Sequence, residues 1–294
     1  MEERVSNPYF TLDEKEELER LEIQARLFKQ FDSEFYEEIK VKYPTLRVLD
    51  IGSNNGSLIM DRLGDAPNLE CILGVEYDEE TVQVANQNHA SDKVRFYASD
   101  LEAEDFEESL ISFMNDKGVT SFNVINCSLI LLHLQNPENI LRILKKYLEP
   151  GGTLLIKEID DGLNLAYPDA DGAFERAIHI ASYLETAGFR HSGRQLYTQL
   201  FDTGYKDIQI RKIGINTCGL SSDDRSALFE TYFRFVKTDL EIMYKNYGTD
   251  CTIEGTRIRE DYDWLLLTFK SLRRRFLEDY FFFNLGLMMI TASV

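Results

Sequence analysis

The stretch that decides the fold runs Val48-Leu49-Asp50-Ile51-Gly52-Ser53-Asn54-Asn55-Gly56. It starts as an apolar β-strand and passes into a turn that contains two glycines. Glycine has no Cβ, so a strand that ends in such a turn exposes backbone N–H groups and lets a ligand approach the main chain. The stretch therefore predicts a nucleotide-like ligand at the end of a buried strand, with an ordinary strand-to-helix turn as the alternative.

Short apolar runs around this stretch alternate with segments of helical periodicity. We expect strands at residues 47–51, 71–76, 94–98, 122–127 and 153–158, and helices at residues 58–63, 80–89, 106–115 and 137–147. Strands that alternate with helices form right-handed crossovers and a mostly parallel sheet that is covered on both faces. The pattern therefore predicts an α/β fold.

Beyond Asp160 the pattern is looser. Helices are expected at residues 173–188 and 194–203, a sixth strand at 206–213, two long helices at 221–247 and 258–280, and a last strand near 283–292. Ser221 followed by Asp224 is a capping signal for the first long helix. We expect the sixth and last strands to pair as an antiparallel hairpin, which makes the two long helices an insertion.

The N-terminal segment is helical by its spacing. Thr11 and Glu14 form a capping box, apolar residues recur at helical intervals to residue 31, and a shorter helix is expected at residues 33–40. The expected organisation is one domain with additions. Its parts are a helical lid over residues 1–44, a core over 45–220, a helical insertion over 221–280 and the last core strand over 281–294.

Composition narrows the class of partners. The 294 residues include 32 Lys+Arg and 51 Asp+Glu, which gives a net charge of −19, and 44% are apolar. The apolar share can fill a globular core, while so acidic a surface repels phosphate backbones and argues against a nucleic-acid partner. The acidic start lacks the form of a signal peptide, and the apolar run over residues 280–294 is too short to cross a membrane. We therefore expect a cytoplasmic protein without a membrane partner.

Two acidic residues follow later strands. Glu76 ends the second strand, 24 positions after Gly52, where a carboxylate can accept hydrogen bonds from both hydroxyls of a ribose. Asp100 follows the third strand, where it can accept a hydrogen bond from the exocyclic amine of an adenine. Each acid taken alone is also explained as a solvated residue at a strand end.

In chain order these residues resemble the motifs of class I S-adenosylmethionine-dependent methyltransferases. The motifs are Asp50-x-Gly52-x-x-x-Gly56, Gly74-Val75-Glu76, Ser99-Asp100 and Leu148-Glu149-Pro150-Gly151-Gly152. The resemblance covers about residues 45–160, and the flanks are more weakly similar to bacterial small-molecule methyltransferases. It implies a Rossmann-like, mostly parallel seven-stranded sheet with an antiparallel last strand, and S-adenosylmethionine as the cofactor.

The resemblance also implies which residues hold the cofactor. They are Arg20, Asp50, Gly52, Asn54, Gly56, Glu76, Tyr77, Asp100, Leu101 and Ser128. Asn54 stands where the family usually has glycine, and because asparagine tolerates positive φ best among the other residues, we expect the turn to survive. A dinucleotide-binding strand would be followed by G-x-G-x-x-G, which is missing after Ile51, so an oxidoreductase is disfavoured.

Methyl transfer from a sulfonium requires the protein to hold the acceptor close, exclude water and accept a proton where needed. His133, after the fourth strand, and Asp160, after the fifth, are the candidate catalytic residues. A packing histidine and an exposed loop acid are the alternative interpretations, and Glu158 and Asp161 have the same two interpretations as Asp160. Metal-dependent catechol-type methyltransferases carry a ligating aspartate near Ser128, where this chain has none, so no metal is expected.

The expected function is S-adenosylmethionine-dependent methylation of a small-molecule acceptor. The alternatives are a non-catalytic S-adenosylmethionine-binding regulatory or assembly protein, and methylation of peptides or proteins. Aromatic residues of the insertion, such as Phe233 and Trp264, exceed what two single-sided helices need, so they form either the acceptor pocket or a homodimer contact. The N-terminal helix is expected to close over the cofactor, with Arg20 or Gln24 facing its amino-acid end.

Overall fold

The computed structural model describes the backbone of residues 14–184 and 188–294, and the side chains from Ile23 onward within these ranges. The described chain forms two compact units. The core unit contains residues 29–160, 191–213 and 287–294, and the helical unit contains the described residues up to 28 together with 161–190 and 214–286. Each unit has a buried apolar interior of its own.

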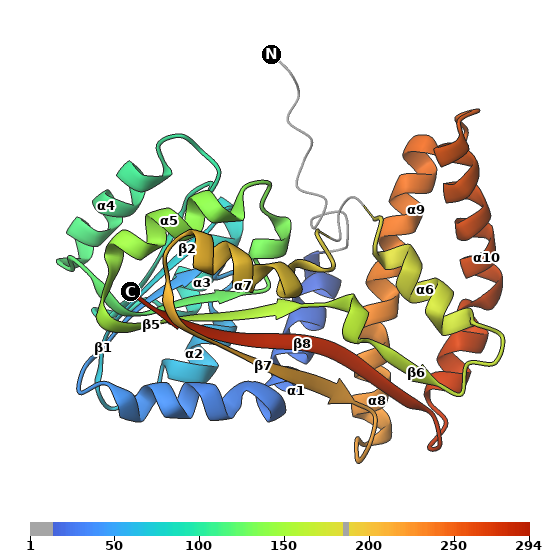
Figure 1. The fold of residues 1–294 in the computed structure, drawn as a ribbon, viewed down its shortest axis with the longest axis horizontal. Helices are drawn as coiled ribbons and strands as arrows, with labels where there is room; N and C mark the ends of the chain where they lie inside the picture. Colours follow the sequence, from blue (N-terminus) through green and yellow to red (C-terminus); the bar gives the residue numbers. More distant parts are fainter. Residues whose placement is uncertain (1–13, 185–187) are drawn as a thin grey trace. The chain divides into compact units, whose positions relative to one another are not determined.

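One sheet carries all the strands of the described chain (Figure 1). The strands are β1 (Leu46–Ile51), β2 (Leu69–Glu76), β3 (Val94–Ala98), β4 (Phe122–Ser128), β5 (Leu148–Ile159), β6 (Leu165–Tyr167), β7 (Lys206–Asn216) and β8 (Phe282–Ser293). Their order is β3-β2-β1-β4-β5-β8-β6, and β7 also pairs with β8. Strands β1 to β5 are parallel and β8 is antiparallel to β5, which confirms the predicted fold class.

The predicted hairpin of the sixth and last strands is present as β7 and β8. Asp207, early in β7, accepts a hydrogen bond from the hydroxyl of Ser293 at the end of β8, at 2.6 Å. Thr217, just after β7, donates its N–H to the carbonyl of Phe283 near the start of β8, at 2.9 Å. The two strands therefore run in opposite directions (Figure 1). The additional strand β6 was not predicted, because it has three residues and exists through its pairing with β8.

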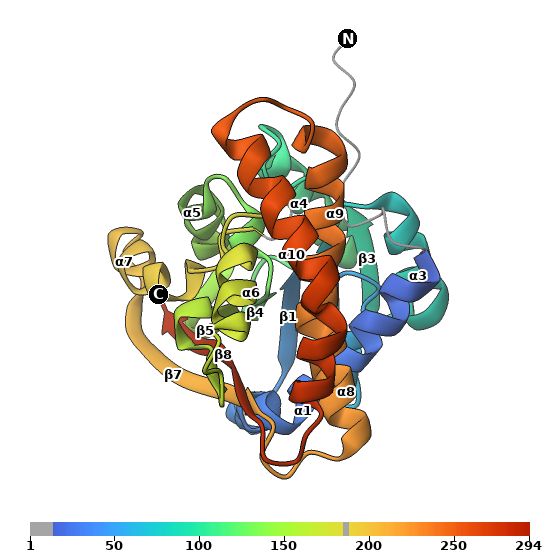
Figure 2. The same ribbon diagram turned by 90° about the vertical axis from the view of Figure 1, so that its right-hand side faces the viewer.

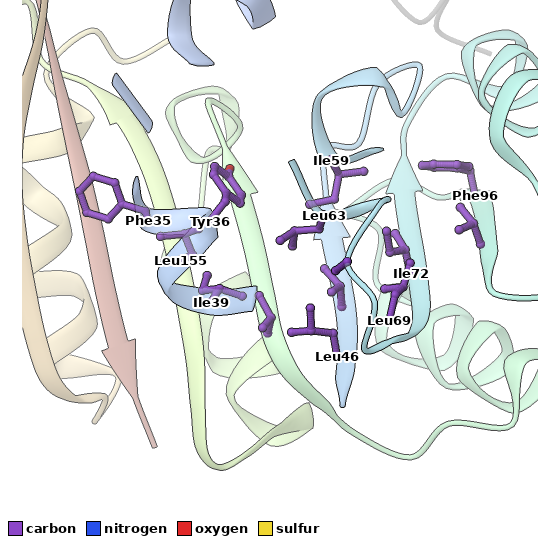
Figure 3. Packing of buried hydrophobic residues seen from close by; sticks show 14 of the residues in the cluster. Phe35, Tyr36, Ile39, Leu46, Ile59, Leu63, Leu69, Ile72, Phe96 and Leu155 are labelled. Carbon is purple, nitrogen blue, oxygen red and sulfur yellow. The ribbon is translucent and has the colours of Figure 1, made fainter. Parts of the chain in front are cut away.

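Helices cover both faces of the sheet in the core unit. They are α1 (Glu14–Lys42), α2 (Ser57–Leu63), α3 (Glu79–His89), α4 (Phe106–Lys117), α5 (Pro137–Tyr147) and α7 (Ser192–Asp202), with the short 3₁₀ turn η2 (Leu131–His133). Tyr36 and Ile39 of α1 pack on the strands with residues of α2, as Figure 3 shows, and the same cluster includes residues of α3. The helices α4, α5 and α7 lie on the opposite face (Figure 1).

Helix α1 is continuous, where the sequence predicts one helix to residue 31 and a second over residues 33–40. The predicted break falls between residues 31 and 33. In the structure the Asp32 carboxylate binds Arg62 and Lys157, and the Ser33 hydroxyl donates to the carbonyl of Lys29 within the helix. Because Asp32 bonds to distant partners and Ser33 bonds to the preceding turn of α1, the helix continues through both residues. Thr11 of the predicted capping box lies outside the described residues.

The helical unit contains the predicted insertion. Its helices are α6 (Ala173–Ala181), α8 (Ser222–Phe229), the π-helical turn η5 (Glu230–Arg234), α9 (Phe235–Tyr247) and α10 (Ile253–Phe276), with the 3₁₀ turn η3 (Asp161–Leu163). Figure 2 shows α9 and α10 side by side. Ser221 caps α8 as predicted, because its hydroxyl accepts the N–H of Asp224 at 3.1 Å. The helix predicted over residues 173–188 ends at Ala181, and residues 185–187 lie outside the described part.

Aromatic rings form the interior of the helical unit. Phe233 is 1% exposed, and its ring lies 5.6 Å from that of Phe174 and 5.1 Å from that of Phe229. The expectation that Phe233 lies on a surplus aromatic face is therefore wrong, because its surroundings are already filled. Trp264 is half-buried under the guanidinium of Arg176, which lies 4.3 Å from the ring centre.

Candidate functional site

The turn after β1 has the left-handed backbone that the sequence predicts. Gly52, Asn54 and Gly56 have φ values of 69°, 46° and 77°. Asparagine adopts this conformation because its short polar side chain bonds locally, and here Asn54 Oδ1 accepts the N–H of Asn55 at 2.7 Å. The expectation that the turn survives without a glycine at residue 54 is confirmed.

The neighbours of two glycines in this turn leave no room for a side chain. A Cβ on Gly52 would lie 2.7 Å from Cγ1 of Ile130, and a Cβ on Gly56 would lie 2.5 Å from the ring of Phe96. Both distances are shorter than carbon atoms tolerate. The main chain of the turn is therefore held close to β3 and to the segment that follows β4.

Glu76 joins the end of β2 to this turn. Its Oε2 accepts the N–H of Asn54 at 2.9 Å, and its Oε1 accepts the N–H of Tyr77 at 2.8 Å. Burial raises the pKa of Glu76, and the backbone N–H groups oppose that shift. Oε1 also accepts the N–H of Asp78 at 3.4 Å, so a ligand hydroxyl can still donate to the remaining lone pair of Oε2.

Asp50 lies at the centre of a row that crosses four strands. The register aligns Phe96, Gly74, Asp50 and Asn126, one residue from each of β3, β2, β1 and β4. Asp50 is 3% exposed, and its Oδ1 accepts a hydrogen bond from Nδ2 of Asn126 at 2.6 Å. Burial raises the pKa of Asp50 to about 7, while the bond from Asn126 and the charge of Lys157 oppose the shift. No other described residue donates to this carboxylate.

A polar atom beside this row has no partner. The hydroxyl of Ser53 is buried and makes no hydrogen bond with any described residue. Buried polar groups are nearly always satisfied, so an unsatisfied hydroxyl in a glycine turn is typical of a site that a polar ligand completes. Together with the carboxylates of Asp50 and Glu76, this hydroxyl fits a cofactor that has ribose hydroxyls at one end and an ammonium group at the other.

The end of β3 adjoins the end of β2. The N–H of Ser99 donates to the carbonyl of Glu76 at 2.9 Å, so the two predicted acids follow neighbouring strands. Asp100 is half-buried and its Oδ1 accepts the N–H of Glu102 at 2.9 Å, and Leu101 is buried. The predicted order of acids along the sheet edge is therefore present.

The segment after β4 is shaped by strained backbone and by a buried carboxylate. Leu129 has a φ of 55°, which is unusual for a leucine, and its N–H donates to the carbonyl of Lys157 at 2.8 Å. Glu158 is fully buried, and its Oε2 accepts the N–H of Leu132 at 3.0 Å. Glu158 thus holds the turn η2, which places the half-buried His133 just beyond the carboxyl end of β4.

Asp160 is buried and ion-paired. It is 1% exposed, and Arg194 of α7 donates to both of its oxygens, at 2.8 Å from Nε and at 2.5 Å from the second nitrogen. Nδ1 of His191 lies 3.5 Å from the same carboxylate. The alternative interpretation as an exposed loop acid is therefore wrong for Asp160, and burial contradicts it also for Glu158 and for Asp161, which pairs with Arg190. The catalytic role of Asp160 stays a prediction.

Sequence reasoning missed a buried polar cluster next to Asp50. Its members are Asp32 and Tyr36 of α1, Arg62 of α2, Asn126 of β4 and Lys157 of β5. The single cation within the apolar run Leu154-Leu155-Ile156-Lys157 is a signal that could have indicated it. The side chain of Arg20, predicted to reach the cofactor, lies outside the described residues.

Comparison with known families agrees with this geometry. Residues 42–189, half of the chain, match the family described as "Methyltransferase domain", and the chain belongs to that family. It is a class I S-adenosylmethionine-dependent methyltransferase, and S-adenosylmethionine is its cofactor. No curated protein matches the chain.

Solved structures share the fold. The YcgJ protein of Bacillus subtilis has a TM-score of 0.52 at 16% identity, over 89% of this chain and 97% of that one. A Bacillus halodurans protein classed as a methyltransferase has a TM-score of 0.51 at 14% identity, over 89% and 98%. Phosphoethanolamine N-methyltransferase 2 of Haemonchus contortus, in complex with S-adenosyl-L-methionine, has a TM-score of 0.51 at 16% identity, over 98% of this chain and 60% of that one. Within the described residues, no helix is long and apolar enough to span a membrane.

Proposed function

We propose that this methyltransferase transfers the methyl group to a small-molecule acceptor. The cofactor supplies an electrophilic methyl group on a sulfonium, so the chain has to bind both partners, align them and exclude water. The observation that carries the proposal is the enclosed carboxyl end of β5. There, the carboxylates of Glu158 and Asp160 are buried and bonded by groups of η2 and α7. Packed, satisfied side chains at this edge favour a closed pocket over an open groove for a peptide.

The cofactor residues of the proposal follow the strand ends. Glu76 accepts the ribose hydroxyls, and Asp100, with Leu101 beside it, receives the adenine. The turn of Gly52, Asn54 and Gly56 lets the cofactor come close to the main chain. Asp50 accepts a hydrogen bond from the ammonium group of the cofactor. Tyr77, Ser128 and Arg20 complete the set. Half-burial of Glu76 and Asp100 and the row through Asp50 support these assignments.

The acceptor residues of the proposal are His133 and Asp160. His133 is the last residue of η2, just beyond the carboxyl end of β4, where an imidazole can take a proton from the acceptor. Asp160, held in place by its ion pair with Arg194, can orient a polar or cationic acceptor. These roles match the edge at which open α/β sheets bind ligands.

One observation favours a second candidate, a non-catalytic binding protein. The carboxylates of Glu158 and Asp160 are already bonded to protein groups, so neither is a ready base. Such a protein would bind S-adenosylmethionine and never transfer its methyl group. Cofactor affinity does not separate the two candidates, whereas turnover does.

The test is a transfer assay with S-adenosylmethionine labelled in its methyl group. The protein is incubated with a cell extract separated into small molecules and proteins, and the labelled product is identified by mass spectrometry. Glu76→Ala is the control, because its weakened cofactor binding reports the background. We expect label in the small-molecule fraction with the wild-type protein only.

Each other outcome has a distinct meaning. Label in the protein fraction would replace the small-molecule acceptor by a protein acceptor. A protein that binds the cofactor and labels neither fraction would favour the non-catalytic candidate.

A further inference from the structure

A carboxylate shared by two cations lies buried in the core unit. Asp32 of α1 is fully buried, and its Oδ1 accepts a hydrogen bond from Nε of Arg62 at 2.8 Å. Its Oδ2 accepts a hydrogen bond from Nζ of Lys157 at 2.8 Å. Lys157 is itself fully buried, and burial lowers its pKa. One carboxylate therefore faces two cations in a region with little water.

Two of the three charged groups buried in this cluster, Arg62 and Lys157, are cations. Arg62 also contacts Asp61 at the surface, and Asp61 is shared with Lys29 at 2.7 Å. Burying a charge is costly, so a further carboxylate near Lys157 stabilises its charged form.

Asp50 is placed to be that carboxylate. Asn126 of β4, which donates a hydrogen bond to Asp50, is aligned with Leu155 of β5. Lys157 comes two residues after Leu155, so the two side chains lie on the same face of β5. The attraction between Lys157 and Asp50 lowers the pKa of Asp50, against the effect of burial. The charge on Asp50 therefore depends on a cation that α1 holds in place through Asp32.

The orientation of Asp50 depends on α1 as well. The hydroxyl of Tyr36 donates to Oδ1 of Asn126 at 3.1 Å, so the amide of Asn126 turns its Nδ2 toward Asp50. That bond occupies Oδ1 of Asp50 and leaves Oδ2 without a described donor. Tyr36 is one helical turn after Asp32, so a single turn of α1 supplies both contacts.

The groups that surround Asp50 come from five elements. They are Asp32 and Tyr36 of α1, Arg62 of α2, Glu76 of β2, Asn126 and Cys127 of β4, and Lys157 of β5. Glu76 opposes ionisation of Asp50, whereas Lys157 and the hydrogen bond from Asn126 favour it. Removal of Lys157 or of the Asn126 amide should therefore raise the pKa of Asp50.

We propose that Tyr36, Asn126 and Lys157 are positioning residues, which keep the Asp50 carboxylate ionised and its Oδ2 directed at the ammonium group of the cofactor. The inference rests on the proposed role of Asp50 at the amino-acid end of S-adenosylmethionine. When Asp50 carries a proton, that proton leaves to solvent as Oδ2 accepts the N–H of the ammonium group. Cofactor binding is thereby coupled to the seating of α1 and to pH.

The experiment compares two nucleosides on the intact protein. S-adenosylhomocysteine and 5′-methylthioadenosine share the adenosine and the thioether, and only the first has the amino-acid end. Calorimetry between about pH 5.5 and pH 8 gives their affinities. We expect the affinity for S-adenosylhomocysteine to fall about tenfold per pH unit below pH 7, and the affinity for 5′-methylthioadenosine to stay level.

Three variants test the positioning residues. Lys157→Met and Asn126→Leu remove groups that favour the ionised carboxylate of Asp50. The pH below which the affinity for S-adenosylhomocysteine falls should therefore rise by about one unit. Tyr36→Phe should produce a smaller rise in the same direction. Tyr43→Phe is the matched control, since its hydroxyl bonds to Gly151 and Thr153 and has no contact with Asn126. Circular dichroism checks that each variant is folded.

The outcomes are separable. An equal pH dependence for both nucleosides in the wild-type protein would overturn the role of Asp50 in the inference. An unchanged pH profile in Tyr36→Phe, which keeps every buried charge and is the variant most certain to fold, would overturn the positioning role. Absence of binding by both nucleosides would contradict the cofactor assignment itself and the inference with it.

Discussion

The carboxylate of Glu76 accepts the backbone N–H of Asn54, at 2.9 Å from Oε2. The acid at the end of β2 therefore holds the turn after β1 in shape before any ligand is present. Asn54 has a positive φ of 46°, a conformation that asparagine adopts less readily than glycine. The hydrogen bond that the N–H of Asn54 donates to the half-buried carboxylate of Glu76 offsets that cost. Glu76 thus has two roles in our proposal, as a ligand of the ribose and as a support of the turn.

Replacement of Glu76 should weaken cofactor binding strongly. A hydrogen bond to a charged group contributes on the order of 1.5 to 3 kcal/mol, so we expect Glu76→Ala to reduce affinity about 10- to 150-fold by calorimetry. Glu70→Ala is the control, because Glu70 is an exposed acid of the same strand that pairs with Arg47. Equal affinities in two folded variants would contradict the role of Glu76.

Replacement of Gly56 by alanine should destabilise the protein more than replacement of Gly118, which has a similar backbone conformation. Gly56 and Gly118 both have positive φ, at 77° and 68°, but only Gly56 lies against Phe96. Positive φ alone costs alanine about 1 to 2 kcal/mol, and overpacking adds about 1 to 3 kcal/mol. In urea denaturation, Gly118→Ala should lower the free energy of unfolding by the cost of positive φ only. Gly56→Ala should lower it by that cost and by the cost of overpacking. If Gly56→Ala is no less stable than Gly118→Ala, the close packing is not limiting.

Asp50→Asn should raise stability at pH 8 while it weakens cofactor binding. The folded pKa of Asp50 is raised to about 7, and the unfolded value is about 3.9. A raised pKa stabilises the fold below about pH 4, and this contribution is lost as the pH rises through 7. At pH 8 the neutral amide should therefore add about 1 to 3 kcal/mol, within the upper bound of about 4 kcal/mol from the shift.

Denaturation at two pH values checks this expectation. The advantage of Asp50→Asn should be largest at pH 8 and about a third as large at pH 5, because Asp50 is then protonated in the folded protein and ionised in the unfolded chain. An advantage of the same size at both values would show that ionisation of Asp50 is not its cause.

Phe233→Ala should destabilise the helical unit rather than impair catalysis alone. Removal of a fully buried phenylalanine leaves a cavity and costs about 3 to 5 kcal/mol. Leu267→Ala is the control on α10, since Leu267 is 85% exposed and its removal should change stability by less than about 0.5 kcal/mol. Thermal melting measures both. A Phe233→Ala protein that melts like the wild type and loses turnover would restore the pocket hypothesis for this residue.

The parts of the fold that the sequence predicts correctly are those set by local pattern. Apolar runs mark all seven main strands, and the glycines with Asn54 mark the turn, because each signal lies within about ten residues. The continuity of α1 depends instead on Asp32 reaching Lys157, 125 positions away along the chain. The strand β6 likewise exists through pairing with β8, more than a hundred residues later. Periodicity carries no information about partners at such distances.

The same limit applies to the candidate site. Glu76 and Asp100 follow strands and are found by position, whereas the ionisation of Asp50 is controlled by side chains from other elements. The sequence allows Asp160 to be an exposed loop acid or a catalytic group, and its burial beside Arg194 is visible only in three dimensions. Residue type and spacing can therefore indicate a ligand contact, but not the state of charge in which it operates.

The place of β8 in the sheet has a consequence for synthesis on the ribosome. Residues 287–292 of β8 pair with residues 154–159 of β5, and β6 and β7 also pair with β8. While the chain grows, β5 is an open, apolar strand edge for more than a hundred residues of translation, and such edges recruit other chains. A nascent chain arrested before Phe282 would therefore expose an aggregation-prone edge, and holdase chaperones should bind such arrested chains and release them once β8 has been translated.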